Sequence, residues 1–402
     1  MKKRNIMKTL FAGTMTLGMA LSVSPAFAVD NETNIEAYLV KELNIEDGIN
    51  YTKTFDFKFD LIKNGTAAVT GDTGDKTISI EISSNDSDHK VAKNIFGDGG
   101  LEYNAAGIYT YNVEETTPDA PDQNDSNYGL KCSDAKYELV VWVKNKTDKS
   151  GVYVERVKVT QLKTDDGTEP VGGDKKVSPN PGGTQDGSDS EFKFVNTYTK
   201  KAGSEDPSHP GHYLATTISK DVEGVYGDLT KDFEFNVYIT LPDTYTGEGQ
   251  FDGVIFEDGK KVNEENTVDY TLSENSPTHI KLSDNQELRI YDLPAGTTYY
   301  VEEIGASNYT PSVNVTKNGS LTVENKKAGK GENLTSKKTD NGAEVDNLIG
   351  ENTNTVAFTN TYDDNSVTPT GIIINNLPFV LMVVVAGSGL ALYVVSKRRS
   401  HQ

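Results

Sequence analysis

The stretch FVNTYTK at residues 194–200 has a near copy, FTNTYDD, at residues 358–364. Both stretches are typical of β-strands, in which successive side chains alternate between the two faces of a sheet. On each strand this alternation places two apolar residues and one asparagine on the same face: Phe192, Phe194 and Asn196 in the first copy, and Val356, Phe358 and Asn360 in the second. A buried asparagine is costly without a partner, so each strand predicts a specific polar arrangement inside an apolar core.

The features around these two strands recur in the same order in both halves of the chain. Each half has a strand with a lysine (38–43 and 217–222), then a phenylalanine-rich strand, and later a glycine-led strand ending in Val-Glu-Glu (107–115 and 296–303). A repeated order of this kind predicts two similar domains. Short alternating strands divided by Gly, Asn and Asp clusters favour an all-β fold of β-sandwiches. We place the domains at residues 30–198 and 212–364, joined by a linker at 199–211.

Both ends of the chain carry patterns typical of export and anchoring. Residues 1–28 combine a basic start, an apolar stretch and a small-residue site, which predicts a cleaved signal peptide rather than a membrane anchor. Residues 377–395 hold no charged side chain and are long enough to span a bilayer, so we place a membrane span at 372–396. The basic tail at 397–402 would then stay in the cytoplasm. A buried core helix is the alternative for this segment.

The pentapeptide VTPTG at residues 367–371 precedes the apolar segment. A pentapeptide, an apolar span and a basic tail in this order resemble a Gram-positive cell-wall sorting signal. The resemblance implies that a sortase cuts between Thr370 and Gly371 and transfers the threonine carbonyl to an amine. Proline is second in the commonest form of the signal, whereas Pro369 is third here, a departure that the resemblance associates with pilus proteins. The mature chain would cover about residues 29–370.

Composition excludes several classes of function. The formal charge is −21, and removal of the two ends would take away basic residues only, so the surface repels nucleic acid and anionic lipid. The single cysteine, Cys132, cannot form an internal disulfide, which exported proteins commonly use for stability. The five histidines fall in no hydrolase or zinc signature, and the pair in HPGH, residues 209–212, reads as a solvated linker. We therefore expect no metal, no cofactor and no turnover enzyme.

Alternation predicts that three polar side chains point into the core of each half. They are Lys41, Glu115 and Asn196 in the first half, and Lys220, Glu303 and Asn360 in the second. One interpretation is a buried ion pair whose remaining hydrogen bonds are satisfied by the asparagine. The other uses the same burial: a desolvated lysine becomes a neutral nucleophile, and a desolvated glutamic acid keeps its proton. The acid donates its proton to the asparagine carboxamide oxygen and so polarises the carbon. The amine then attacks this carbon, ammonia leaves, and an amide joins the first strand to the last without a cofactor.

The chain resembles streptococcal major pilins of the T-antigen type, which repeat a pilin isopeptide-linkage domain. The matching stretches are YLVKEL and TISKDV, TFDFKF and KDFEF, GIYTYNVEE and IKLSDNQELRIYDLPAGTTYYVEE, and the two FxNTY endings. The resemblance implies two tandem Ig-like, CnaB-like β-sandwiches with bonds Lys41–Asn196 and Lys220–Asn360. Glu115 and Glu303 would be catalytic. The adjacent Glu114 and Glu302 are rejected because alternation puts them on the outer face.

The resemblance also implies polymerisation on the surface of a Gram-positive bacterium. A sortase would join the C-terminal threonine of one subunit to a lysine of the next, and would finally attach the pilus to peptidoglycan. Lys176 in KKVSP is our candidate for that lysine and Lys175 the second choice; two ordinary solvated lysines are the alternative. Expected partners are the sortase, other pilin subunits, peptidoglycan and host surface ligands. A wall-anchored adhesin or stalk that never polymerises is the alternative function.

Overall fold

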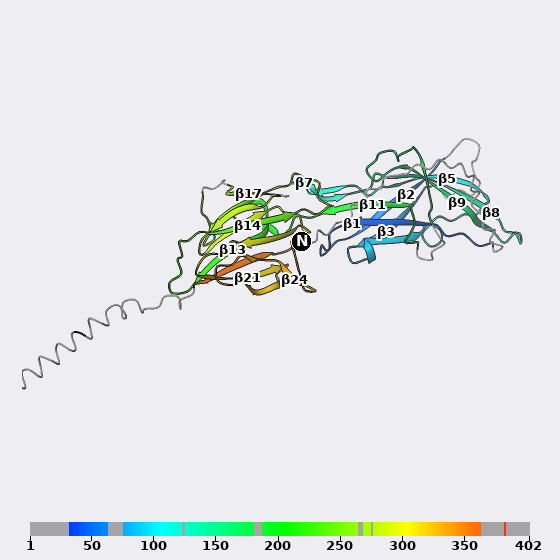
Figure 1. Cartoon of the computed structure of the whole chain (residues 1–402). Helices are drawn as coiled ribbons and strands as arrows, with labels where there is room; N and C mark the ends of the chain where they lie inside the picture. Colours follow the sequence, from blue (N-terminus) through cyan, green and yellow to red (C-terminus); the bar gives the residue numbers. More distant parts are fainter. Residues whose placement is uncertain are drawn as a thin grey trace, which may run out of the picture.

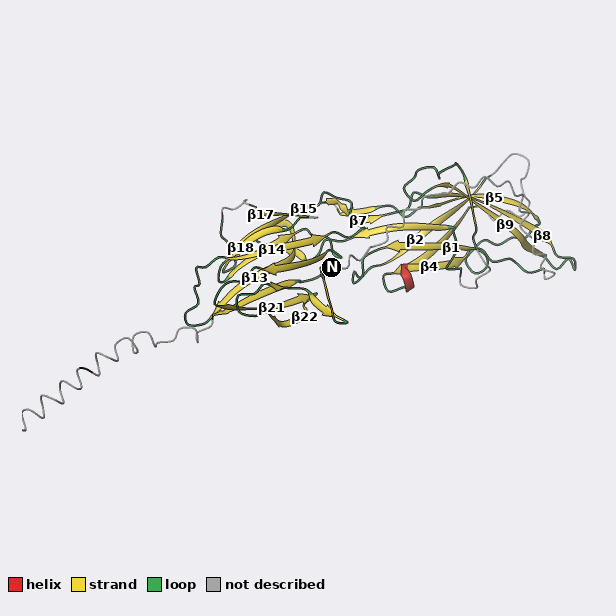
Figure 2. Ribbon diagram, viewed as in Figure 1, coloured by secondary structure: helices red, strands yellow, loops and turns green. Residues whose placement is uncertain are grey.

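The computed structural model describes residues 32–62, 75–122, 125–180, 187–263, 268–274, 276–362 and Met382. Two strand-rich bodies follow each other along an elongated molecule (Figure 1). Between residues 32 and 362, the helix found in the described part is one 3-10 turn, Ser87–His89, so the predicted all-β fold is confirmed (Figure 2). The described residues include no helix long and apolar enough to cross a membrane. The expected signal peptide, sortase motif and cytoplasmic tail lie outside them, as does the expected span except for Met382.

The first domain is built from two sheets. The five-stranded sheet has the order β4 (Lys90–Asn94), β1 (Tyr38–Asn44), β11 (Lys193–Thr199), β7 (Asp125–Lys131) and β6 (Ala120–Asp122). The six-stranded sheet has the order β10 (Lys175–Val177), β9 (Val152–Lys163), β8 (Lys136–Asn145), β5 (Gly107–Glu115), β2 (Thr52–Leu61) and β3 (Lys76–Ser83). The first and last long strands of the domain, β1 and β11, are therefore neighbours, and they run parallel.

The second domain repeats this plan with more strands. Its larger sheet has the order β16 (Lys260–Lys261), β15 (Gln250–Glu257), β19 (Gln286–Tyr291), β13 (His209–Glu223), β27 (Thr355–Tyr362), β21 (Tyr309–Lys317) and β22 (Ser320–Lys327), with β12 (Ser204–Asp206) on β13 and β17 (Tyr270–Ser273) on β15. The other sheet contains β18 (Thr278–Leu282), β14 (Phe233–Thr240), β20 (Thr298–Glu303), β23 (Leu334–Thr335) and β26 (Asn347–Leu348). A small hairpin joins β24 (Lys338–Asp340) to β25 (Ala343–Val345). Here too the first long strand, β13, runs parallel to the last, β27.

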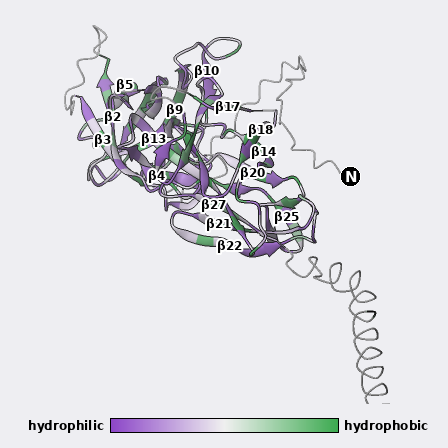
Figure 3. Cartoon of the chain, turned by 90° about the vertical axis from the view of Figure 1, so that its left-hand side faces the viewer, coloured by the Kyte–Doolittle hydropathy of each residue, from purple (hydrophilic) through white to green (hydrophobic). Residues whose placement is uncertain are grey.

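The core of each domain lies between its two sheets. Phe55, Phe57 and Phe59 of β2 are fully buried, as alternation predicted, and hydrophilic and hydrophobic residues interleave along the strands (Figure 3). The ring of Phe57 meets that of Phe194 from the opposite sheet, with centroids 4.9 Å apart. Burial of each such ring contributes about 2–3 kcal/mol to folding, so aromatic packing holds the sheets face to face.

The strand register is the same in both domains. On the parallel pair β1 and β11, Lys41 lies opposite Phe194 and Leu43 opposite Asn196. On β13 and β27, Lys220 lies opposite Phe358 and Val222 opposite Asn360. Each asparagine is thus two positions beyond the lysine's partner and shares its face. The carboxylates come from the facing sheet, where Glu115 pairs with Phe57 and Glu303 with Phe235.

Several segments that look irregular in the sequence are paired strands. Residues 204–206 and 209–211, in the expected linker, belong to β12 and to the start of β13 in the second domain. Ala202 between the domains is fully buried, and its backbone N–H donates to the carbonyl of Leu293. The polar run around residue 176 includes the edge strand β10. Backbone pairing needs no apolar alternation, which explains why these strands leave no hydrophobic pattern.

Candidate functional site

The structure brings Lys41, Glu115 and Asn196 together inside the first domain. Lys41 Nζ lies 3.0 Å from Glu115 Oε2, and Asn196 Nδ2 donates to Glu115 Oε1 at 2.7 Å. Each carboxylate oxygen therefore serves one partner. The side chains of Lys41 and Glu115 have no exposed surface, and Asn196 is fully buried. The three polar residues that alternation placed on the inner faces therefore form one hydrogen-bonded cluster.

The surroundings of Lys41 favour its neutral form. Burial lowers the pKa of Lys41, and the charge and hydrogen bond of Glu115 only partly oppose this effect. Besides Glu115, Lys41 Nζ has the backbone carbonyl of Phe194 at 3.5 Å and the centre of the Phe55 ring at 4.5 Å. An amine with a lowered pKa keeps a free lone pair more often and is a better nucleophile.

Asn196 is held by a second, backbone contact. Its Oδ1 accepts a hydrogen bond of 2.8 Å from the backbone N–H of Ser133, which follows β7. An N–H group requires an acceptor, so this contact fixes the carboxamide with its oxygen toward Ser133 and its nitrogen toward Glu115. From the sequence we expect the glutamic acid to donate to the carboxamide oxygen. In the first domain the carboxyl group instead faces the nitrogen that would leave as ammonia.

The second domain places Lys220, Glu303 and Asn360 in the equivalent arrangement. Asn360 Nδ2 donates to Glu303 Oε1 at 2.5 Å, and Lys220 Nζ lies 3.8 Å from the same oxygen. Lys220 Nζ also donates to the carbonyl of Asp221 at 3.1 Å. Lys220 is fully buried, and Glu303 and Asn360 are each 1% exposed. In this cluster a single carboxylate oxygen, Glu303 Oε1, faces both the lysine and the asparagine, whereas in the first cluster each partner has its own oxygen.

Burial shifts both ionisable groups of the second cluster toward their neutral forms. Desolvation lowers the pKa of Lys220 to about 8 against the opposing charge of Glu303. Desolvation also raises the pKa of Glu303, against the charge of Lys220 and the hydrogen bond from Asn360. Glu303 Oε2 and Asn360 Oδ1 are buried without a hydrogen-bond partner. A negatively charged oxygen that is buried without a donor is costly, which favours the protonated form of Glu303.

The neighbouring glutamates lie on the outer faces of the sheets. Glu114 forms an ion pair of 2.7 Å with Lys136, and both side chains are about half exposed. Glu302 accepts hydrogen bonds from Asn236 and Asn333. Neither is in contact with the lysine–asparagine clusters through these bonds, as alternation predicted for the strand faces.

The two candidate polymerisation lysines lie at the edge of the six-stranded sheet. Lys175 and Lys176 are exposed on β10 and pair with Gln161 and Thr160 of β9, whereas Val177 is buried. A lysine on an edge strand is accessible to another protein while its backbone is held in place. Thr370 and Gly371, the expected cleavage site, lie outside the described residues.

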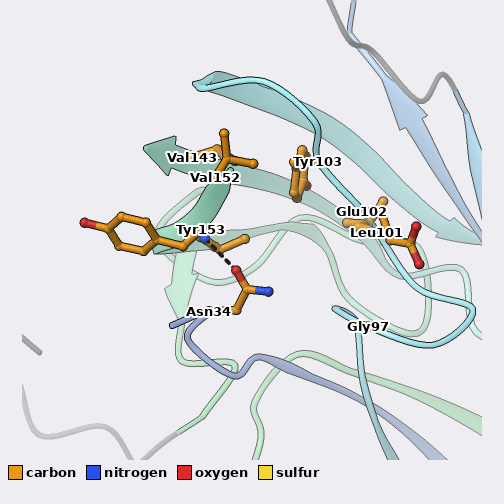
Figure 4. A pocket seen from close by; sticks show the side chains of 9 residues that line it. Asn34, Gly97, Leu101, Glu102, Tyr103, Val143, Val152 and Tyr153 are labelled. Atoms are coloured by element: carbon orange, nitrogen blue, oxygen red, sulfur yellow. Dashed lines mark hydrogen bonds between the residues drawn. The ribbon is translucent and has the colours of Figure 1, made fainter. Parts of the chain in front are cut away.

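Among the residues that the structure describes, the histidine pair and one pocket form no further reactive cluster. His209 and His212 of the HPGH stretch lie in β13 with stacked rings, and His212 Nδ1 is 2.7 Å from Asp292. Within the described part of the chain, no three His, Cys, Asp or Glu side chains are grouped to hold a metal ion. A pocket at the β8–β9 end of the first domain is lined by nine residues, of which Glu102 is the one carboxylate (Figure 4).

Two residues of the first cluster's surroundings were not identified from the sequence. Ser133 and Asp165 lie in polar turns, and Ser133 Oγ donates to Asp165 Oδ1 at 2.6 Å. Cys132 lies beside the cluster, where burial, followed by Glu115, raises the pKa of its thiol to about 12, so the thiol stays protonated. No apolar periodicity marks these positions, because their side chains and backbone act through hydrogen bonds across the fold.

Comparison with known proteins identifies relatives of this chain. Residues 215–362 match a domain family of unknown function, DUF7601. The chain is 27% identical over 186 residues to a pilin of Streptococcus pyogenes serotype M1, which covers 46% of this chain and 48% of that pilin. It is 31% identical over 98 residues to a pilus tip adhesin of Streptococcus pyogenes, which covers 24% of this chain and 12% of the adhesin.

These matches confirm the resemblance seen in the sequence as homology to a streptococcal pilin. The chain spans about half the length of the pilin and about an eighth of the adhesin. Among solved structures, the major pilin of Streptococcus pyogenes aligns over 82% of this chain and 99% of its own, with 17% identity and a TM-score of 0.32. The T-13 major pilin of Streptococcus pyogenes aligns over 82% and 98%, with 19% identity and a TM-score of 0.29.

Proposed function

We propose that this chain, a homologue of a streptococcal pilin, is a structural subunit of a pilus on a Gram-positive cell surface, stabilised by two self-formed Lys–Asn amide bonds. The observation that carries the proposal is the recurrence of one buried lysine–glutamate–asparagine cluster, with the same strand register, in both domains. A single buried ion pair is common in proteins. The recurrence of the pair in equivalent positions, with an asparagine beside it each time, supports amide-bond formation in both domains. Pilins are structural proteins, so the chain has no turnover chemistry.

The bond in each domain forms in one intramolecular reaction, in which addition of the amine is followed by loss of ammonia. In the first domain the neutral amine of Lys41 attacks Cγ of Asn196, and a new C–N bond forms. Glu115 transfers a proton to Nδ2 of Asn196, the C–Nδ2 bond breaks, and ammonia leaves. The surplus proton on Nζ returns to the Glu115 carboxylate, so the carboxyl group is regenerated. Lys220, Glu303 and Asn360 perform the same exchange in the second domain. Neither exchange consumes a cofactor.

Each bond would close a long loop of the chain. The first joins residues 41 and 196, and the second joins residues 220 and 360. By the chain-entropy argument used for disulfides, closing loops of this length stabilises each domain by about 5 kcal/mol, chiefly by restricting the unfolded state. The bonds also join parallel neighbouring strands, so a pull along the molecule would load a covalent link. This would replace the disulfides that a chain with one cysteine cannot form internally.

The same proposal includes attachment by a sortase. Cleavage between Thr370 and Gly371 would give an acyl group that passes to a lysine of the next subunit, with Lys176 the first candidate and Lys175 the second. Both lysines are exposed on an edge strand, which supports access by a sortase and another subunit. Partners would be the sortase, further copies of the subunit and peptidoglycan, with host surface ligands contacted by the finished pilus. The mature protein would be secreted and anchored to the cell wall.

The intact mass of a recombinant chain covering residues 29–364 tests the crosslinks. Each bond releases one ammonia, so two bonds lower the mass by about 34 Da. A Glu303→Ala variant should lose only about half of that deficit, because the first cluster still reacts. The neighbouring Glu302→Ala variant is the matched control and should keep the full deficit. An unshifted wild-type mass would show that Lys41 and Lys220 are ordinary buried partners.

The 98-residue similarity to a pilus tip adhesin favours an adhesive role. The second candidate function is therefore a wall-anchored adhesin or stalk, which in this alternative is never polymerised. Both functions would use the same two crosslinks, so the mass measurement does not separate them. Cell-wall extracts probed with an antibody against this chain do. A shaft subunit gives a ladder of covalent multimers that disappears with Lys176→Ala or the Lys175→Ala, Lys176→Ala pair. A lone adhesin gives one wall-bound species.

A further inference from the structure

We propose that the backbone N–H of Ser133 stabilises the negative oxygen that forms on Asn196 during the first crosslinking reaction, and that Asp165 holds this N–H in position. The inference rests on the proposed crosslinking function and adds to it a catalytic backbone group and a positioning residue. Both are specific to the first domain. Neither belongs to the lysine–glutamate–asparagine cluster itself.

The contact geometry is that of an oxyanion donor. Ser133 N lies 2.8 Å from Asn196 Oδ1, and both groups are buried. When the amine of Lys41 adds to Cγ, the carbonyl double bond opens and its electron pair moves onto Oδ1. A hydrogen bond to a charged oxygen is stronger than one to a neutral carbonyl, above all away from water. The existing N–H contact would therefore stabilise the tetrahedral intermediate more than the starting amide.

Asp165 ties this donor to the strand that carries the asparagine. Asp165 Oδ1 accepts from Ser133 Oγ at 2.6 Å and from the backbone N–H of Val195 at 2.8 Å. Its own carbonyl accepts from the N–H of Asp134 at 2.9 Å. Val195 directly precedes Asn196. One side chain thus sets the distance between the Ser133 turn and the reacting carboxamide.

The hydrogen bonds around Asn196 divide the reaction into two tasks. Ser133 serves the oxygen, where charge develops, while Glu115 serves the nitrogen, which leaves as ammonia. The two oxygens of Glu115 face Lys41 Nζ and Asn196 Nδ2, so the carboxyl can receive a proton on one side and deliver it on the other. With Oδ1 already bound by Ser133, Glu115 is free for proton transfer.

The second domain provides a matched internal control. Among the hydrogen bonds of the described residues, Asn360 Oδ1 has no donor, although it is buried. Its reaction would depend on Glu303 for both tasks. A change at Asp165 should therefore slow the first crosslink and leave the second unchanged in the same molecule.

The test follows the two crosslinks separately in chains of residues 29–364 made by a short pulse of cell-free synthesis. Samples are quenched over time, digested, and the two crosslinked peptides are quantified by mass spectrometry. Asp165→Ala should slow the first crosslink by about tenfold or more, in line with the loss of a well-placed oxyanion donor, while the second keeps its wild-type rate. Asp165→Asn keeps an acceptor oxygen at the same place and should restore the first rate. Ser133→Ala, which keeps the N–H but loses the tie to Asp165, should fall between them.

A variant that cannot form the first crosslink shows whether Asp165 acts on the reaction or only on folding. Asp165→Ala in an Asn196→Ala background cannot crosslink the first domain, so its near-ultraviolet circular dichroism and hydrogen exchange report folding alone. A native signature there together with a slow first crosslink supports the proposal. If that double variant is unfolded, Ser133→Ala decides: a first crosslink at the wild-type rate overturns the proposal and a slower one supports it. An unchanged first rate in Asp165→Ala also overturns it, while absence of both crosslinks in the wild type overturns the proposed function instead.

Discussion

A lysine in the interior of a β-sandwich needs a compensating feature, and here each buried lysine has a glutamate and a ring beside it. Lys220 Nζ lies 4.3 Å from the centre of the Phe233 ring and 3.8 Å from Glu303 Oε1. An aromatic face attracts a cation only modestly, while desolvation penalises the charge strongly. The balance lowers the pKa of Lys220 to about 8, so its neutral, nucleophilic form is far more populated than that of a free lysine. The residue least suited to a core by its charge is the one best suited to react there.

The lowered pKa of Lys220 predicts how stability depends on pH when Asn360→Ala prevents the proposed second crosslink. The folded-state pKa is about 8 and the ordinary value is 10.5, so between these pH values the unfolded chain binds more protons than the folded one. Stability of the second domain should therefore rise with pH from about 8 to about 10.5, by up to about 3 kcal/mol, and should show no further Lys220 penalty above that range. Chemical denaturation at several pH values measures this dependence.

Lys220→Met in the same Asn360→Ala background is the control for that dependence. Methionine has a similar length and no titrating group, so the rise between pH 8 and 10.5 should vanish. A rise of equal size in both variants would assign it to other groups and would contradict a depressed lysine pKa.

The strands show which parts of the molecule a sequence pattern can reveal. Phe55, Phe57 and Phe59 alternate because one face of β2 is buried, and a pattern imposed by burial is readable. The same reasoning placed Lys41 and Asn196 on one face. It could not show that Ser133 contacts Asn196, because a backbone N–H in a turn has no residue signature. The edge strand at Lys176 was missed for a related reason, since its pairing with β9 uses backbone groups alone.

The hairpin from β21 to β22 permits a prediction for one element. Asn318 and Gly319 both have positive φ, 52° and 75°, as a two-residue turn that matches the strand twist requires. No atom lies within 4 Å of where a Cβ on Gly319 would stand, so the backbone conformation alone opposes a side chain. Gly319→Ala should therefore destabilise the second domain by about 1 kcal/mol.

The measurement uses urea unfolding in the Asn360→Ala background, where the domain can unfold without a covalent tie. Ser320→Ala, at the exposed start of β22, is the matched control and should change stability little. Equal midpoints for Gly319→Ala and its parent would mean that the turn relaxes to another conformation.

At the scale of the whole molecule, the joint between the domains is built from buried and charged contacts rather than a loose tether. Glu351 of the second domain binds both Asn50 Nδ2 at 2.7 Å and Lys200 Nζ at 2.9 Å. Tyr128 of the first domain donates its hydroxyl hydrogen to the carbonyl of Asp292. Composition alone favoured a linker here, since Gly, Ser, Pro and His fill residues 199–211. Long-range contacts override that local preference, because they give the polar groups partners in the fold.

Lys201 is the residue through which this joint can be tested. It is 6% exposed and lies between Asp125 of the first domain, at 3.9 Å, and Asp292 of the second, at 3.4 Å. The rings of Tyr128 and Tyr213 lie 5.2 and 5.5 Å from its ammonium group. Lys201→Ser would leave two carboxylates facing each other without the cation between them. Repulsion in a partly buried site should then loosen the joint while each domain remains folded.

The expected outcome is a wider distribution of distances between a fluorophore on each domain in single-molecule energy transfer, with both crosslinks still present by mass. The exposed Lys163→Ser variant is the matched control and should keep the narrow distribution. Because screening weakens repulsion between charges, added salt should partly narrow the Lys201→Ser distribution. A distribution as narrow as that of the unchanged chain would mean that Glu351 and the tyrosines hold the joint by themselves. A broad distribution would instead identify one buried lysine as the group that keeps the two domains in line.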